Sequence, residues 1–474
     1  MNRRFILFAL LIGLSLKVMA QGSGMNLQQC IDYAVANATP IQISKLDEQI
    51  ASAKVKETTG LGLPQVNGSV SIINNTQLRR FFASYTEDSF FFGGQSIPGV
   101  NEGDVISAQN FFQLKSSGDA GVNISQLIFN GSYIVGLQAS RAFKDLSVKN
   151  TQQKKSEVIE QVTKAYYLVI VNRVRINLFD QNIARIDTLL KNTIALNKQG
   201  FAESIDVDRL KVAYNNLKNE REKFTNLGDL SVELLKFQMN WPMDQELKVV
   251  GELSDLDPSV DLNAYAADWS YDDHPEYQLL NGNRKLQQLN LRNNYAMALP
   301  SVVAIANMGY STQSPDVAGL FRTNTNLNES EGVGPDKWYS YGLVGLSVNL
   351  PLFSGFQRTF KIQQERINLM KIDKGLNALR SGIDLEMKQA IISYRNALKT
   401  MSSQKENMSL AQNIARVVQI KYEQGVGSNL EVMDAESSLK EAQVNYYNAL
   451  YDALVAKVNL DKAYGKLNQK SLEQ

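Results

Sequence analysis

The sequence contains very few of the residues that carry most enzyme chemistry. Among 474 residues there is one cysteine and one histidine. Cys30 therefore cannot form a disulfide within the chain. His274 alone leaves no cluster of histidine and cysteine for a metal site or a nucleophile–base pair. Since catalysis would rest on carboxylates alone, we expect no enzyme, no cofactor and no metal.

Long apolar runs are missing from the interior of the chain, where none reaches the roughly 20 residues of a membrane-spanning helix. If the protein enters a membrane, we expect it to do so as a β-barrel. The first twenty residues differ, because Arg3 and Arg4 precede an apolar stretch over 5–16 and small residues follow up to Ala20. This pattern predicts a cleavable export signal rather than an anchor. Cys30 lies too far beyond that cleavage point to carry a lipid.

Excess charge of either sign is also missing. The chain carries 49 basic and 48 acidic residues, and without the three basic residues of the export signal the balance is 46 to 48. A nucleic-acid-binding protein would show a basic excess gathered on one face. We therefore predict no nucleic-acid partner.

Proline is absent from residues 99–241 and 352–474. Because proline costs about 3 kcal/mol in a helix interior, these two tracts can form very long helices. We expect them over 131–198 and 355–424, each about 100 Å long at 1.5 Å per residue. Shorter helices over 204–240 and 428–465 would follow, each after a turn.

The chain contains an internal repeat. The residue pattern of 121–131 recurs at 345–355, and that of 200–207 recurs at 425–432. Each copy predicts a short helix, a strand, a loop, a strand, a long helix, a turn and a second helix. The expected divisions are the signal 1–20, the first repeat 21–240, a segment between the repeats at 241–272, the second repeat 273–465 and a tail 466–474.

Alternation with period two predicts the strands. Val66, Val70 and Ile72 alternate with polar residues in the first strand, and even-numbered positions from 344 to 352 are apolar in the last. A soluble sandwich gives the same alternation as a membrane barrel, so the pattern alone leaves both open. Four strands cannot close a barrel, which needs about eight, so several chains would have to share one.

The last helix carries a seven-residue repeat in which six of the ten positions are alanine. This predicts closely packed, left-handed coiled helices. Its positions are Val432, Ala435, Leu439, Ala442, Tyr446, Ala449, Ala453, Ala456, Leu460 and Ala463.

Together these features resemble the TolC family of outer-membrane efflux proteins, over essentially the whole mature chain. The most specific segments are 425–436, 200–209 and 350–355. The resemblance implies an α+β membrane protein with internal duplication. It also implies a homotrimer whose twelve strands, four per chain, would close one outer-membrane β-barrel. A long α-helical coiled-coil barrel would continue it through the periplasm, with an equatorial belt from the segment 241–272.

The resemblance also implies the function, a passive exit duct for a tripartite efflux pump or a type I secretion system. Its partners would be outer-membrane lipid, a periplasmic adaptor protein and an inner-membrane transporter. Two alternatives have no channel activity. An exported structural coiled-coil protein would not explain the duplicated strands, and a periplasmic adaptor would carry one hairpin without the full-length duplication.

The family closes its periplasmic end with rings of acidic side chains and polar links. Three copies of a carboxylate around an axis form a constriction that attracts cations. Alternatively, carboxylates in a first helical turn only offset the macrodipole, with Ser204 and Ser428 as caps. The residues on family gate positions are Asp206, Tyr422, Glu431 and Asp434.

One position departs from the family pattern, since relatives can place a gate-locking arginine where this chain has Gly427. Arg209 or Lys421 would have to supply the lock. The resemblance also assigns the two turns to adaptor docking, although any helical hairpin tends to have a glycine turn. The docking residues are Gly200, Phe201, Ala202, Gly425, Val426 and Gly427.

Aromatic residues bracket the loop of the first repeat, where either a lipid-interface girdle or an apolar plug is consistent with them. They are Phe81, Phe82, Phe90, Phe91, Phe92, Phe111 and Phe112. The second loop, 313–337, is expected to be exposed, with 338–341 as its interfacial anchor.

Overall fold

A computed structural model describes residues 24–86, 97–108, 110, 112–252, 258–262, 265, 269–322 and 337–467. The predicted export signal, Phe90, Phe91, Phe92 and Phe111, most of the second loop and residues 468–474 of the tail lie outside the described residues. Contacts group the chain into two compact units, each built from both repeats. The first is Met1–Ser52, Arg141–Gln287 and Ile367–Gln474, and the second is Ala53–Ser140 and Gln288–Arg366. The domains predicted from the repeat have different boundaries from these two units, and they stay a prediction.

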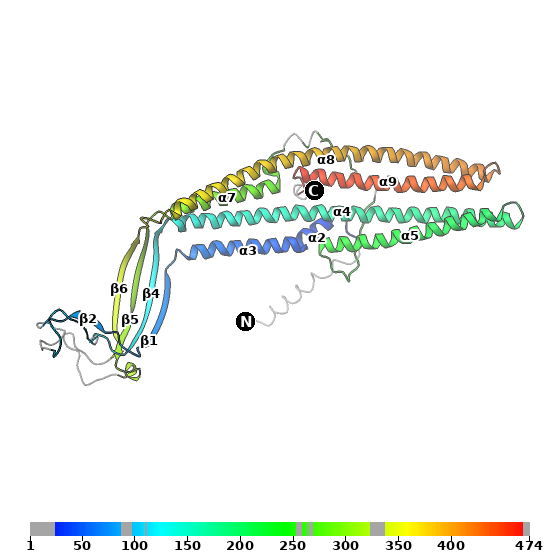
Figure 1. Ribbon diagram of the computed structural model, residues 1–474. Coiled ribbons are helices and arrows are strands. Elements are labelled where there is room, and N and C mark those ends of the chain that lie inside the picture. Colours follow the sequence, from blue (N-terminus) through cyan, green and yellow to red (C-terminus); the bar gives the residue numbers. More distant parts are fainter. Residues whose placement is uncertain are drawn as a thin grey trace, which may run out of the picture. The chain divides into compact units, whose positions relative to one another are not determined.

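Long helices dominate the chain, and the two longest lie within the two proline-free tracts. α4–α5 and α8–α9 form two helical hairpins (Figure 1). The four predicted long helices are confirmed, with ends within two residues of those expected. The helices are α2 (Leu27–Asn37), α3 (Thr39–Gly60), α4 (Gly131–Lys198), α5 (Ser204–Met239), α7 (Pro275–Ala296), α8 (Gln357–Glu423) and α9 (Asn429–Ala463), with short 3-10 helices η3 (Tyr271–Asp273) and η4 (Ala318–Phe321).

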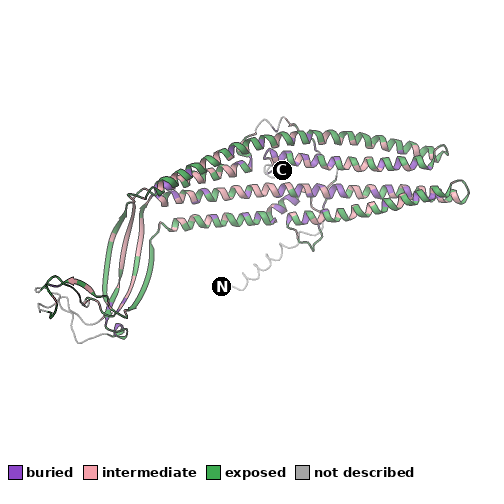
Figure 2. Cartoon of the chain, viewed as in Figure 1, coloured by how far each residue is buried: buried purple, intermediate pink, exposed green. Residues whose placement is uncertain are grey.

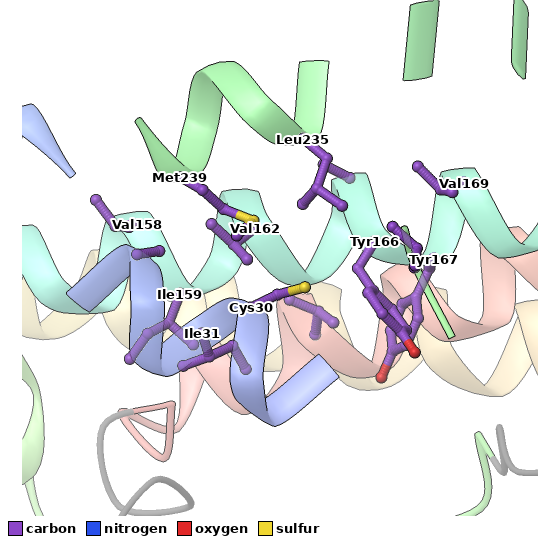
Figure 3. Close-up of a cluster of buried hydrophobic side chains, with 14 of the residues drawn as sticks. Cys30, Ile31, Val158, Ile159, Val162, Tyr166, Tyr167, Val169, Leu235 and Met239 are labelled. Carbon is purple, nitrogen blue, oxygen red and sulfur yellow. The ribbon is translucent and has the colours of Figure 1, made fainter. Parts of the chain in front are cut away.

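The core of the first unit forms where α2 packs against α4, α5 and α9. Cys30 is fully buried there, as predicted for a helix residue, against side chains that include Val162 and Met239 (Figure 3). Leu450 and Leu454 of α9 belong to the same cluster. The predicted seven-residue seam of α9 is confirmed, because all ten of its positions are buried or half-buried.

The second unit contains a four-stranded antiparallel sheet in the order β1-β4-β5-β6. The pair β4–β5 joins the two repeats, and Gly121 faces Gly309 across it. β1 and β6 lie at the two edges, each with a neighbouring strand on one side in the described sheet. The strands are β1 (Gln65–Asn74), β4 (Ser116–Asn130), β5 (Ser301–Ser314) and β6 (Tyr339–Asn349).

One face of this sheet is apolar and open. Val70 and Val344 are 76% and 85% exposed. Figure 2 shows the contrast: buried residues lie along the helices, whereas β1 and β6 are exposed almost throughout and β4 and β5 are mostly half-buried. The alternation predicted from the sequence is therefore present, but the described residues place no second layer over it. Among the described residues, no helix is both long enough and apolar enough to cross a membrane.

Two details differ from the sequence prediction. β6 ends at Asn349 instead of continuing to Leu352, because Pro351 has no N–H to donate and restricts the residue before it. The loop after β1 also holds a small antiparallel hairpin, β2 (Phe81–Ser84) with β3 (Val105–Ala108), which the sequence did not predict. Phe82 and Phe112 are largely exposed.

Candidate functional site

The two hairpin turns of the first unit have the same backbone structure. Gly200 and Gly425 take φ values of +80° and +77°, a region that glycine enters without the steric cost of a Cβ. In the first turn the N–H of Phe201 donates to the Leu196 carbonyl at 2.9 Å, and in the second Val426 donates to Lys421 at 3.0 Å. With the inner bonds from Gly200 and Gly425, these close two Schellman motifs.

The turns present apolar tips. Phe201 is 79% and Val426 is 77% exposed. Behind the first tip, the Asn197 amide donates to the Ala202 carbonyl at 2.7 Å. The structure also explains the glycine at position 427, where a Cβ would come 3.0 Å from the Tyr422 nitrogen. An arginine at this position would require the turn to shift.

The predicted gate residues lie next to these turns on three helices. Asp206 is in the first turn of α5, and its carboxylate is 3.6 Å from the Arg209 guanidinium. The amide of Asn429, the first residue of α9, lies 3.4 Å from the Asp206 carbonyl oxygen. The Tyr422 hydroxyl on α8 lies 3.3 Å from that of Thr193 on α4. The turn ends of the two hairpins are thus linked by polar contacts.

Glu431 and Asp434 are exposed on the first turns of α9. Ser428 caps this helix, accepting a hydrogen bond from the Glu431 N–H at 3.2 Å, as predicted. The corresponding prediction for Ser204 is wrong. The N-cap of α5 is Glu203, which makes no side-chain capping bond, and Ser204 is already the first helical residue. A capping side chain must come from the extended residue before the helix.

Further contacts between the hairpins were not identified from the sequence. The Arg185 guanidinium lies 3.0 Å from the Glu436 carboxylate, and the Lys440 ammonium 3.2 Å from that of Glu220. Glu436 lines two grooves, with cavity volumes of about 260 Å³ and 330 Å³; Asp434 lines the first and Tyr422 the second. In the sequence, Glu436 could have been identified as a contact residue from its position directly after the seam residue Ala435.

A family profile described as "Outer membrane efflux protein" matches residues 277–466. The chain is 22% identical to outer membrane protein TolC of Salmonella enteritidis over 474 residues, covering 98% of this chain and 87% of TolC. In sequence and in fold, the chain is similar to the TolC-like outer membrane efflux proteins. The resemblance predicted from the repeat, the turns and the strand–helix junction is confirmed.

Solved structures of outer-membrane channels share the TolC-like fold of this chain. The crystal structure of CusC superimposes with a TM-score of 0.70 at 14% identity, covering 94% of this chain and 95% of CusC. The open-state MtrE channel of Neisseria gonorrhoeae gives 0.69 at 17% identity, with 93% and 89% covered. These findings support a TolC-like, non-enzymatic transport protein of the outer membrane that extends into the periplasm.

Proposed function

We propose that three copies of this chain form one outer-membrane channel, the passive exit duct of a tripartite efflux pump. The four strands of one chain cannot enclose a pore, because a closed barrel needs about eight. β1 and β6 occupy the two edges of the sheet. If β6 of each chain pairs with β1 of the next, three chains close twelve strands and leave no open edge.

The open apolar face of the sheet is the observation that carries this proposal. Val70, Val344 and Leu346 are between 72% and 85% exposed in the single chain. A soluble sandwich would bury such a face, since burying apolar area stabilises a fold by about 25 cal/mol per Å². Contact with lipid satisfies the same side chains in an outer-membrane barrel, with the polar face turned to the lumen.

The helical hairpins supply the periplasmic part of the duct and its partner surface. We place the contact with a periplasmic adaptor protein at the exposed tips around Phe201 and Val426. An inner-membrane transporter would complete the pump and select the cargo. A type I secretion system would use the same duct, and the partner that binds the tips distinguishes the two roles.

The proposed gate lies beside the tips. Asp206, Glu431 and Asp434 place carboxylates near the turn end of the hairpins, and Tyr422 links α8 to α4 through Thr193. Repeated three times around an axis, the carboxylates form a negative constriction that attracts cations. Arg209 already neutralises part of the Asp206 charge, so it is our candidate for the lock that Gly427 does not provide.

Single-channel recording in planar bilayers tests the gate. Asp206→Ala combined with Asp434→Ala should raise the conductance and weaken block by multivalent cations added on the periplasmic side. Asp208→Ala is the matched control, because this exposed carboxylate is two residues along α5 and so points about 200° away from Asp206. If the double variant and wild type show the same conductance and block, the gate assignment is wrong while the channel fold stands.

A further inference from the structure

The four-stranded sheet carries a single charged side chain. β1, β5 and β6 contain no acidic or basic residue, and β4 contains only Asp119. Asp119 is half-buried near the middle of the sheet's width, opposite Ser71 on β1 and Ser311 on β5. The strands thus provide hydroxyl groups around this carboxylate but no cation. The nearest basic residues precede the strands: Lys115 comes directly before β4, and Lys337 comes two residues before β6, with its ammonium 5.3 Å from the centroid of the Tyr339 ring.

Asp119 lies on the polar face of the sheet. Alternation places it on the same side as Ser71 and Ser311, with which it is in register. The opposite side carries Val70 and Val344, the apolar residues that we assign to lipid. A charged residue on the lipid face of a barrel is destabilising. The carboxylate therefore faces the lumen of the proposed channel.

Two facing glycines leave room for a tyrosine that donates a hydrogen bond to this carboxylate. Tyr341 on β6 is in register with Gly309 on β5, and Gly309 with Gly121 on β4. A Cβ on Gly121 or Gly309 would come 2.9 Å or 3.0 Å from the Tyr341 hydroxyl. Because both positions are glycine, the tyrosine lies across two strands, and its hydroxyl donates to the Asp119 carboxylate at 3.0 Å.

We infer that Asp119 is a specificity-determining residue, which gives the outer end of the duct a preference for cations independently of the periplasmic gate. The residue lies three positions from the end of β4 that is remote from α4, roughly 35 Å along the strand from its helix end. This inference rests on the proposed trimer, in which three Asp119 carboxylates form one ring in the lumen. Rings of acidic side chains select cations by their field.

Reversal potentials in planar bilayers under a KCl gradient test the inference. Wild type should prefer cations, and Asp119→Asn should move the reversal potential towards zero and reduce block by a trivalent cation added on the extracellular side. Asp119→Glu keeps the charge and should keep both properties. Asp206→Ala with Asp434→Ala should leave the extracellular block unchanged, because these carboxylates belong to the periplasmic end.

Tyr341→Phe is the structural control, since it removes the hydroxyl but leaves an aromatic ring over the glycines and the charge on Asp119. The reversal potential of the Tyr341→Phe channel should keep the sign that indicates a preference for cations. An Asp119→Asn channel with wild-type selectivity and block would overturn this inference but leave the proposed function standing. So would a Tyr341→Phe channel that loses as much selectivity as Asp119→Asn, because the effect would then be structural. If wild type forms no channel at all, the proposed function fails and the inference with it.

Discussion

The reactivity of Cys30 tests how α2 packs in the core of the helical unit. It is fully buried against α4 and α5, and burial raises the pKa of its thiol to about 12. The thiolate is the reactive form, so the native protein should react very slowly with a thiol reagent such as DTNB, even near the ordinary thiol pKa of about 8.5. The denatured chain should react with one equivalent. Rapid modification of the native protein would contradict this packing of α2.

Individual side chains were predicted from the sequence only where their partners are local. Ser428 could be assigned as a cap because the bond to Glu431 spans three residues. Thr193 and Tyr422 are 229 residues apart in the chain, and their contact depends on the register between two hairpins. The same holds for Asp119 and Tyr341 across the sheet. No local pattern encodes such registers, so these contacts required the structure.

At the scale of elements, the two repeats provide an internal comparison of helix caps. Ser428→Ala removes the capping acceptor of α9 and should destabilise the start of that helix by about 1 kcal/mol. Ser204→Ala at the equivalent turn should have little effect, because Ser204 makes no capping bond. Hydrogen exchange measures this directly. The Glu431 amide should exchange faster in Ser428→Ala than in Ser204→Ala. Equal protection of this amide in the two variants would show that the cap contributes nothing.

Long elements were predicted well, and short ones were not. The limits of α4 and α8 follow from proline-free tracts and the repeat, since a helix of such length leaves a sustained periodic signal. β2 and β3 have four residues each, too few for a period to be recognised. The end of β6 was placed too late because the apolar alternation runs on past Asn349, while the missing N–H of Pro351 ends the pairing.

At the scale of the whole molecule, the proposed barrel requires several chains, because four strands cannot close one. The duplicated chain supplies one sheet with two edges and an open apolar face. Sequence alternation could not distinguish a sandwich from a barrel, because both have one apolar face; the exposure of that face in the structure favours the barrel.

Native mass spectrometry of the protein, extracted with detergent from the outer-membrane fraction, tests the central claim most directly. We predict a complex with the mass of three mature chains, since three four-stranded sheets close the proposed barrel. A protein that remains in the soluble fraction as a monomer would contradict the account of a shared outer-membrane duct.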